Sequence, residues 1–339
     1  MTDGWSVARA LTDPGSVATP DAAGWTHLLS AARALSLIGT LAEVMAGRDV
    51  PADIARVLAD VRQSNIAGQR QALWEAECAK IALAAYSGKV VLLKGTAFAA
   101  AGYDAALGRS IGDLDILVDR AGLDQVEALL LAAGWEWVKP DPYDDAYYRQ
   151  WMHELPPLIH AERDRMIDVH HTILPLTARL TPDAAALIAD ARALPSGLHI
   201  LSPADIICHA AAHLIADGDL SGGMRNLWDI DRLVRQFLAQ EPKFPQALEE
   251  RARLHGLTDA VARALRLSQR VFGTPPVIPL SPERSDALFL RRMTAVDGWG
   301  RKTRKLTRQA FYMRSHLLRM PPRMLARHLW TKWRKGHRG

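Results

Sequence analysis

Two aspartates separated by one residue are the strongest chemical signal in this 339-residue chain. Asp113 and Asp115 lie at the start of an apolar run, 114–118, that has the composition of a buried strand. Side chains two residues apart on a strand point to the same face, about 7 Å apart. Carboxylates this close repel each other unless a cation lies between them, and hard oxygen ligands suit Mg²⁺. The pair therefore predicts a magnesium site that shares its ion with phosphate.

A third carboxylate would complete a site for two metal ions. Asp168 is the best candidate, because residues 166–170 alternate apolar and polar side chains as a strand does. Three such carboxylates can hold two ions that stabilise the attacking and leaving oxygens of an in-line phosphoryl displacement. His170 lies on the same face as Asp168, and one expected role for it is to orient that carboxylate. We expect Asp113, Asp115 and Asp168 to be both metal ligands and catalytic residues.

Phosphate contacts are expected where the preceding strand ends. Gly95 and Thr96 lie at this turn, where a glycine lets the backbone approach a phosphate and a helix start offers free N–H groups. Lys94 and Arg109 would add positive charge, so these four residues form the predicted triphosphate-binding set. Two alternatives are equally well supported: Lys94 pairs with Asp113, and Arg109 is an ion-pair partner that holds the carboxylate strand.

Histidines raise a second metal hypothesis. His170 and His171 are adjacent, and His209 and His213 lie four residues apart on one face of a predicted helix. Zinc would need a third ligand from elsewhere in the chain. The acidic candidates for that ligand are Asp217 and Asp219. Buried histidines satisfied by hydrogen bonds are the more common arrangement, and we favour it here.

The elements around these residues predict a small α+β core between helical regions. Helical periodicity covers residues 25–45, 54–86 and about 181–271. A polar segment with several prolines, 139–156, is typical of a loop or insertion. The predicted strands are 89–93, 114–118, 135–138 and 166–170, and shorter helices are expected near 97–101 and 123–133.

We therefore expect four regions in the chain. They are a helical N-terminal region, a core with a mixed sheet and helices, a helical C-terminal region and a basic tail. Their expected bounds are 1–88, 89–175, 176–300 and 301–339. The proline-rich stretch 273–282 is the expected linker within the C-terminal region.

The composition is that of an ordinary folded protein, with 49% apolar and 23% charged residues. The two cysteines, Cys78 and Cys208, exclude a disulfide framework and a cysteine-rich zinc site. The first residues lack the pattern of a secretory signal, and no run of about 18 apolar residues occurs. These features predict a cytoplasmic protein without a transmembrane segment.

Charge is distributed unevenly along the chain. Residues 301–339 contain thirteen of the 42 Lys and Arg residues and none of the 37 acidic residues, so the remainder is net negative. This tail has three interpretations: a solvated terminus, a membrane-surface helix, or an arm that binds RNA or another polyanion. Pro321 and Pro322 interrupt any long amphipathic helix, which favours the first.

The order of strand, Gly-hydroxyl turn, short helix and Asp-x-Asp strand resembles the DNA polymerase β-like nucleotidyltransferase superfamily. More narrowly, residues 60–240 are similar to a group of bacterial nucleotidyltransferases. The motifs that carry this resemblance are Leu93-Lys94-Gly95, Tyr103-Asp104, Arg109, Asp113-Leu114-Asp115-Ile116-Leu117-Val118, Ile167-Asp168-Val169-His170 and Arg225-Asn226-Leu227-Trp228-Asp229-Ile230. The commoner superfamily motif has Gly-Ser, whereas Gly95-Thr96 departs from it but keeps the hydroxyl.

The resemblance implies a mechanism. An NTP such as ATP would bind with Mg²⁺ on Asp113 and Asp115, while Gly95 and Thr96 hold its β- and γ-phosphates. A second Mg²⁺ bridged to Asp168 would activate an acceptor hydroxyl, which attacks the α-phosphorus and expels pyrophosphate. Direct proton transfer to Asp168 is the alternative.

The acceptor stays open at this point, and a small molecule, a peptide or protein, and RNA are all compatible with the sequence. Two other functions also stay open. One is a nucleotide- or nucleic-acid-binding module whose core is inactive and whose basic tail, 301–339, is the binding surface. The other is a toxin-like nucleotidyltransferase that modifies tRNA or protein and uses the tail for docking.

Overall fold

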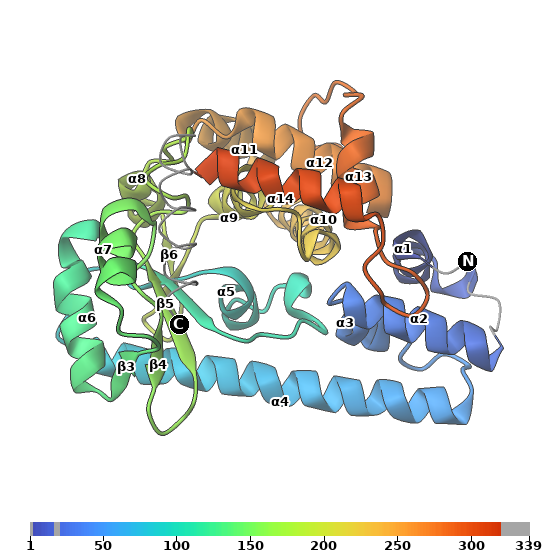
Figure 1. Ribbon diagram of the computed structural model, residues 1–339, viewed down its shortest axis with the longest axis horizontal. Coiled ribbons are helices and arrows are strands. Elements are labelled where there is room, and N and C mark those ends of the chain that lie inside the picture. The colour runs from blue at the N-terminus through green and yellow to red at the C-terminus, as the bar shows by residue number, and fades with distance from the viewer. Residues whose placement is uncertain (1–2, 17–20, 320–339) are drawn as a thin grey trace, which may run out of the picture.

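A seven-stranded mixed sheet flanked by helices forms the α+β core that the sequence predicts. The computed structural model describes residues 3–16 and 21–319. The strand order is β3-β4-β5-β2-β1-β7-β6. The strands are β1 (Val91–Leu92), β2 (Leu114–Leu117), β3 (Trp135–Trp137), β4 (Leu158–His160), β5 (Met166–His170), β6 (Arg192–Ala193) and β7 (His199–Ile200). Figure 1 shows the sheet on the left of the molecule, with α4 below it and the C-terminal helices above.

The strands that carry the predicted carboxylates lie inside the sheet. β2 pairs in parallel with β5 on one side and antiparallel with β1 on the other. Every residue of β2 is buried, which explains why its sequence is almost continuously apolar. Asp115 is the exception within this buried strand, and a buried carboxylate at such a position needs a specific partner.

Two strands correct the prediction that residues 181–271 are entirely helical. β7 pairs in parallel with β1, and β6 pairs antiparallel with β7. Each strand has only two residues, which is too short to show an alternating pattern. Their pairing depends on contact with a strand about one hundred residues earlier in the chain, so the local sequence does not specify it.

The segment expected to be a loop, 139–156, contains a helix. α7 (Pro142–Trp151) begins at a cap formed by Asp141, whose side chain accepts hydrogen bonds from the backbone N–H groups of Tyr143 and Asp144. Proline fits the first helical position because its missing N–H is not needed there. The loop prediction was wrong because the prolines were interpreted as breakers, although Asp-Pro is also a helix-start signal.

The helices before the sheet are α1 (Gly4–Thr12), α2 (Ala22–Ala34), α3 (Ile38–Val44) and α4 (Ala52–Ala82). The single helix expected over 25–45 is broken between α2 and α3, where Ser36 has a φ of 58°. The expected second helix is confirmed as α4, which runs from the N-terminal helices to the sheet (Figure 1). It also packs against α5 (Lys94–Ala100), the short helix that follows β1.

The remaining helices are α6 (Leu123–Ala132), α8 (Ala184–Ala189), α9 (Pro203–Ala211), α10 (Gly223–Gln240), α11 (Phe244–Leu254), α12 (Thr258–Phe272), α13 (Asp286–Met293) and α14 (Lys305–Arg319). α9 continues into a π-helical turn (Ala212–Asp217), against which α12 and α14 pack. π-Helical turns are frequent at functional sites. α14 lies within the described part of the basic tail, residues 301–319, and Pro321 and Pro322 lie outside the described residues. None of the described helices could cross a membrane.

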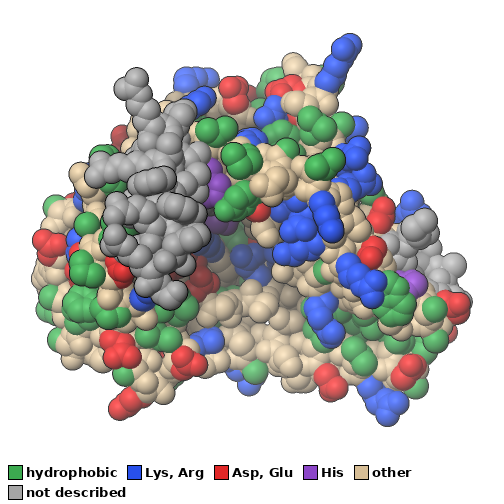
Figure 2. Space-filling view, in the orientation of Figure 1, with side chains coloured by type: hydrophobic (Ala, Val, Ile, Leu, Met, Phe, Trp, Pro, Cys, Tyr) green, Lys and Arg blue, Asp and Glu red, His purple; other side chains and the backbone are tan. Residues whose placement is uncertain are grey.

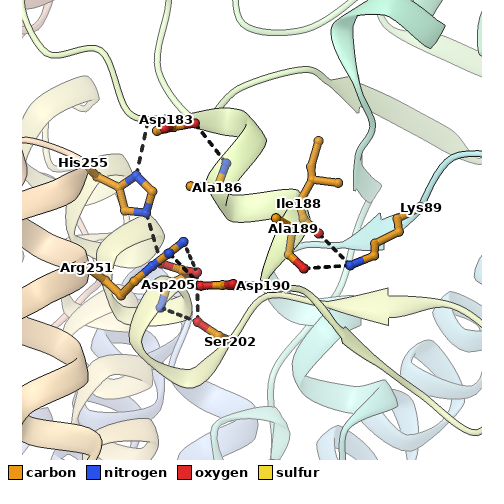
Figure 3. A network of polar contacts seen from close by, with 10 residues as sticks. All are labelled: Lys89, Asp183, Ala186, Ile188, Ala189, Asp190, Ser202, Asp205, Arg251 and His255. Atoms are coloured by element: carbon orange, nitrogen blue, oxygen red, sulfur yellow. Dashed lines mark hydrogen bonds and ion pairs between the residues drawn. The ribbon is translucent and has the colours of Figure 1, made fainter.

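A buried carboxylate fixes α9 against α11 (Figure 3). Asp205 accepts hydrogen bonds from Arg251, with Nε 2.7 Å from Oδ1 and Nη2 2.8 Å from Oδ2. His255 Nδ1 accepts from the backbone N–H of Asp183, so its Nε2 carries the proton and donates to Asp205 at 3.1 Å. Ser202 Oγ donates a further bond of 2.8 Å. The network ties the starts of α8 and α9 to the end of α11.

Candidate active site

The sheet brings the three predicted carboxylates together. Asp113 lies just before β2, Asp115 on β2 and Asp168 on β5. Asp115 and Asp168 are register partners on parallel strands, so their side chains leave the same face of the sheet. One carboxylate oxygen from each of the three residues lies within 4.8 Å of the other two. This set of hard oxygen donors, in which Asp113 is exposed, suits a divalent ion.

The electrostatics of these carboxylates favour a bound cation. Burial, together with the negative charges of Glu154 and Asp115, raises the pKa of Asp168 to about 7. Burial would also raise the pKa of Asp115, but the hydrogen bond from His170 and the charge of Lys94 outweigh it and hold that pKa well below its usual value. Of Asp115 and Asp168, Asp168 is therefore the carboxylate whose ionised form a further positive charge would stabilise more.

Lys94 pairs with Asp115, whereas one sequence interpretation paired it with Asp113. Its Nζ lies 2.5 Å from Asp115 Oδ1. Burial alone would lower the pKa of Lys94, but the Asp115 charge and hydrogen bond outweigh it and raise this pKa, so the amine stays protonated. Lys94 has a φ of 49°, a strained conformation for a residue with a side chain. Such strain concentrates at functional positions, here the junction of β1 and α5.

Gly95 and Thr96 lie in the first turn of α5 rather than in a turn before it. A Cβ added to Gly95 would lie 2.7 Å from Arg109 Nε, so the position is shaped for glycine. Thr96 is 1% exposed, and its Oγ1 has no hydrogen-bond partner among the described residues. Arg109 Nε is likewise buried and unsatisfied within the described parts of the chain. Unsatisfied polar atoms are uncommon in protein interiors, so the two require an explanation.

Arg109 forms an ion pair with Asp229 of α10, which corrects the alternative that it holds the carboxylate strand. Asp229 is 3% exposed and also accepts a hydrogen bond from Arg225 Nε at 2.8 Å. Arg225 is buried in turn, and it donates to the Ala105 carbonyl at 2.7 Å and to Thr40. This network anchors Arg109 to α10, with its Nε beside Gly95.

Two residues that the sequence interpretation missed, His153 and Glu154, lie next to His170 beside the carboxylates. His170 directs Nε2 toward Asp115 Oδ1 at 3.0 Å, so it orients Asp115 and not Asp168 as expected. Its Nδ1 lies 3.4 Å from Glu154 Oε2, and His153 Nε2 lies 3.6 Å from that same oxygen. A backbone bridge joins Glu154 to His170. The adjacent His-Glu pair was the available signal, but it lay in the segment interpreted as a loop.

His171 is the satisfied buried histidine that we favoured. Its Nε2 lies 3.2 Å from the carbonyl oxygen of Met152. Burial and the positive charge of Arg120 lower the pKa of His171 to about 4, so the ring is neutral near pH 7. Although adjacent to His170, it does not belong to either cluster of possible metal ligands among the described side chains.

The second histidine pair also belongs to neither cluster of possible metal ligands in the described part of the chain. His209 and His213 line a small pocket of about 50 Å³ together with Lys94, Arg109 and Asn226. A larger pocket of about 320 Å³ shares His213 and Asn226 with it. The two pockets therefore adjoin at these residues, and we refer to them together as the recess: the smaller is lined by Lys94 and the larger by Tyr312 of α14.

The molecule is hollowed on the face shown in Figure 2. Basic, acidic and histidine side chains gather in the hollow, between the C-terminal helices and the tan surface formed along α4. Further Lys and Arg side chains lie on its right-hand edge. A charged recess of this kind, beside buried carboxylates, is suited to a polar, anionic ligand.

One protein family matches most of the chain. The family is described as uncharacterised nucleotidyltransferase, and its model matches residues 21–273. That span contains the whole sheet, the three carboxylates and every residue of the recess up to Asp229. No curated protein matches the chain.

Proposed function

The chain belongs to the family described as uncharacterised nucleotidyltransferase, and on that premise we propose that it transfers a nucleoside monophosphate from an NTP to a hydroxyl-type acceptor. We also assign its core to the DNA polymerase β-like superfamily, because β1, α5 and the carboxylate strand β2 follow one another in that order. The observation that carries the proposal is the convergence of Asp113, Asp115 and Asp168, whose oxygens lie within 4.8 Å of one another.

These three aspartates would hold Mg²⁺. Their donor set is entirely oxygen, and the pKa of Asp168 is raised first by burial and then by neighbouring negative charge, both of which a bound cation would offset. We propose two ions, as in other two-metal phosphoryl-transfer sites. When bound, Mg²⁺ supplies charge neutralisation of the triphosphate and lowers the pKa of the acceptor hydroxyl.

The nucleotide phosphates would bind at the start of α5. Arg109 packs directly against Gly95, so a Cβ at residue 95 would displace the Arg109 side chain. Thr96 Oγ1 and Arg109 Nε are buried donors without partners among the described residues, and the Arg109 guanidinium, which lines the recess, would contact phosphate oxygens there. Lys94, already protonated against Asp115, adds charge at the same place.

Transfer of the nucleoside monophosphate then occurs in a single displacement at the α-phosphorus. The acceptor O–H gives its proton to Asp168 while its oxygen forms a bond to the α-phosphorus. The bond from that phosphorus to the bridging oxygen of the β-phosphate breaks, and pyrophosphate leaves with the electron pair. A carboxylate within reach of the acceptor O–H can act as this general base. Lys94 and Arg109 stabilise the charge on the departing pyrophosphate.

Position-specific labelling tests this reaction. The full-length protein is incubated with Mg²⁺, cell RNA, protein and small-molecule fractions, and ATP, GTP, CTP or UTP labelled at the α- or the γ-phosphorus. We expect α-label on an acceptor and γ-label only in pyrophosphate. Transfer of γ-label to the acceptor would show phosphoryl transfer instead. Mg²⁺-dependent nucleotide binding without any transfer would favour the inactive binding module.

A further inference from the structure

A second group of metal-ligand side chains lies next to the carboxylates. One ligand atom from each of His153, Glu154 and His170 lies within 4.8 Å of the other two. We propose that these three residues bind a transition-metal ion of the zinc class, separate from the Mg²⁺ of the three aspartates. The proposal is independent of nucleotidyl transfer, and it places zinc where the sequence interpretation favoured ordinary buried histidines.

The distances are close to those of a tetrahedral site. Zn²⁺ binds nitrogen and carboxylate oxygen at about 2.0–2.2 Å, so two ligands of a tetrahedron lie about 3.3–3.6 Å apart. His170 Nδ1 lies 3.4 Å from Glu154 Oε2, and His153 Nε2 lies 3.6 Å from the same atom. These two separations therefore already match those between ligands of one Zn²⁺ ion, and the two histidine ligand atoms lie within 4.8 Å of each other.

The hydrogen bonding of His170 leaves its other ring nitrogen available to a metal ion. His170 Nε2 is 3.0 Å from Asp115 Oδ1, and donation of its proton there leaves a lone pair on Nδ1. That lone pair lies 3.4 Å from Glu154 Oε2, a separation typical of two ligands that share one ion. The same ion would also engage His153, whose Nε2 lies 3.6 Å from Glu154 Oε2. Histidine ligands that donate their other nitrogen to a carboxylate are a common feature of zinc sites.

The backbone holds these ligands in place. His153 and Glu154 are consecutive, and a bend at residues 152–153 lets both side chains face His170. The His153 carbonyl accepts a 2.9 Å hydrogen bond from the His171 N–H, and the Leu155 N–H donates at 2.9 Å to the Val169 carbonyl. The segment therefore runs along β5 as a short pairing, and the site is largely formed before any ion binds.

The ligand types separate this site from the magnesium site. Two imidazole nitrogens and one carboxylate suit Zn²⁺, whereas Mg²⁺ prefers oxygen ligands. The His153 and Glu154 side chains are 15% and 18% exposed, so an ion can enter and a water molecule can complete the coordination. A bound ion would fix His170 and, through it, the orientation of Asp115. The expected role is positioning of a carboxylate rather than contact with the nucleotide.

Metal retention by the purified full-length protein tests the proposal without any NTP. The protein is dialysed against a chelator, equilibrated with Zn²⁺ or Co²⁺ and desalted. Metal content is measured by mass spectrometry, and the Co²⁺ form by visible absorption. The variants are His153→Ala and His153→Gln, of which the second keeps side-chain size if the first misfolds. Asp113→Asn controls for binding at the carboxylates, and His199→Ala controls for loss of a histidine elsewhere. Circular dichroism confirms that each variant is folded.

We expect one equivalent of Zn²⁺ and the strong visible absorption of four-coordinate Co²⁺. Loss of a residue that coordinates the ion should weaken metal binding more than loss of a residue that only hydrogen-bonds a ligand. Both His153 variants should therefore bind Zn²⁺ at least ~10-fold more weakly than the wild type. Asp113→Asn and His199→Ala should bind like the wild type. The proposal is overturned if the wild type retains no metal, or if the His153 variants retain as much as it does. It is also overturned if Asp113→Asn loses the ion as completely as they do, because the ion would then occupy the carboxylates.

Discussion

Asp115 on β2 and Asp168 on β5 are register partners across two adjacent parallel strands. Neither strand is at an edge, since β2 lies between β5 and β1 while β5 lies between β4 and β2. Both carboxylates are therefore fixed by hydrogen-bonded neighbours on each side. A site built on interior strands is positioned more rigidly than one on loops, which suits a metal-dependent displacement at phosphorus. Asp113, just before β2, completes the group from a less constrained position.

The absence of a side chain at residue 95 should be essential for nucleotide binding, because Arg109 packs directly against Gly95. A Cβ at Gly95 would lie 2.7 Å from Arg109 Nε, and Arg109 is anchored by Asp229. We expect Gly95→Ala to lower kcat/KM for the NTP at least ~10-fold, because a clash of this size displaces a phosphate-binding group. Gly68→Ala is the matched control, since nothing lies within 4 Å of a Cβ there. Steady-state kinetics of both variants checks this, and equal activities would contradict it.

The Asp205 network should make a large contribution to stability. Asp205 is fully buried and bonded to Arg251 and His255, so its removal takes away the buried partner of Arg251 and leaves it only the more exposed Asp190. We expect Asp205→Ala to lower the free energy of unfolding by about 3–5 kcal/mol, measured by urea denaturation. The exposed pair of Arg192 and Glu241 provides the comparison, and Glu241→Ala should cost about 0–1 kcal/mol. Similar losses for the two variants would argue against a structural role for the network.

Stability should fall as the solution is acidified from neutral pH. Burial, assisted by the positive charge of Lys94, lowers the pKa of His209 well below its usual value. The folded protein keeps this ring neutral, while the unfolded chain takes up a proton below about pH 6.5. Unfolding therefore binds a proton in that range, and lowering the pH favours it. The free energy of unfolding should fall less between about pH 7.5 and about pH 5 in His209→Asn than in the wild type. Identical pH dependence in the two proteins would contradict the burial of a neutral His209.

The carboxylates were predictable because their signals are local. Asp113 and Asp115 border an apolar run, and Asp168 lies in an alternating one, so strand periodicity alone puts the side chains on defined faces. Pairing of β2 with β5 then brings the two strands together. The long periodic helix α4 was predictable for the same reason. Local pattern was sufficient wherever the element was long enough to show its period.

The partners of the charged side chains could not be predicted in this way. Arg109 and Asp229 are 120 residues apart, and their ion pair exists because α10 packs near the turn after α5. Nothing in the local sequence distinguishes that pairing from one with the carboxylate strand. Glu154 was missed for a related reason, since its contact with His170 forms only when the segment after α7 lies along β5.

The most direct test of the central claim compares Asp113→Asn with Asp119→Asn in transfer of α-label from an NTP. Both aspartates are exposed and lie at opposite ends of β2, so the substitutions change charge equally, but only Asp113 belongs to the three-carboxylate group. Loss of a residue that hydrogen-bonds a metal ligand lowers activity about 10–100-fold, so loss of a metal ligand itself should lower transfer activity more than ~100-fold. The account predicts that loss in Asp113→Asn and near-normal transfer in Asp119→Asn. Undiminished transfer in Asp113→Asn, at the same Mg²⁺ concentration, would contradict it.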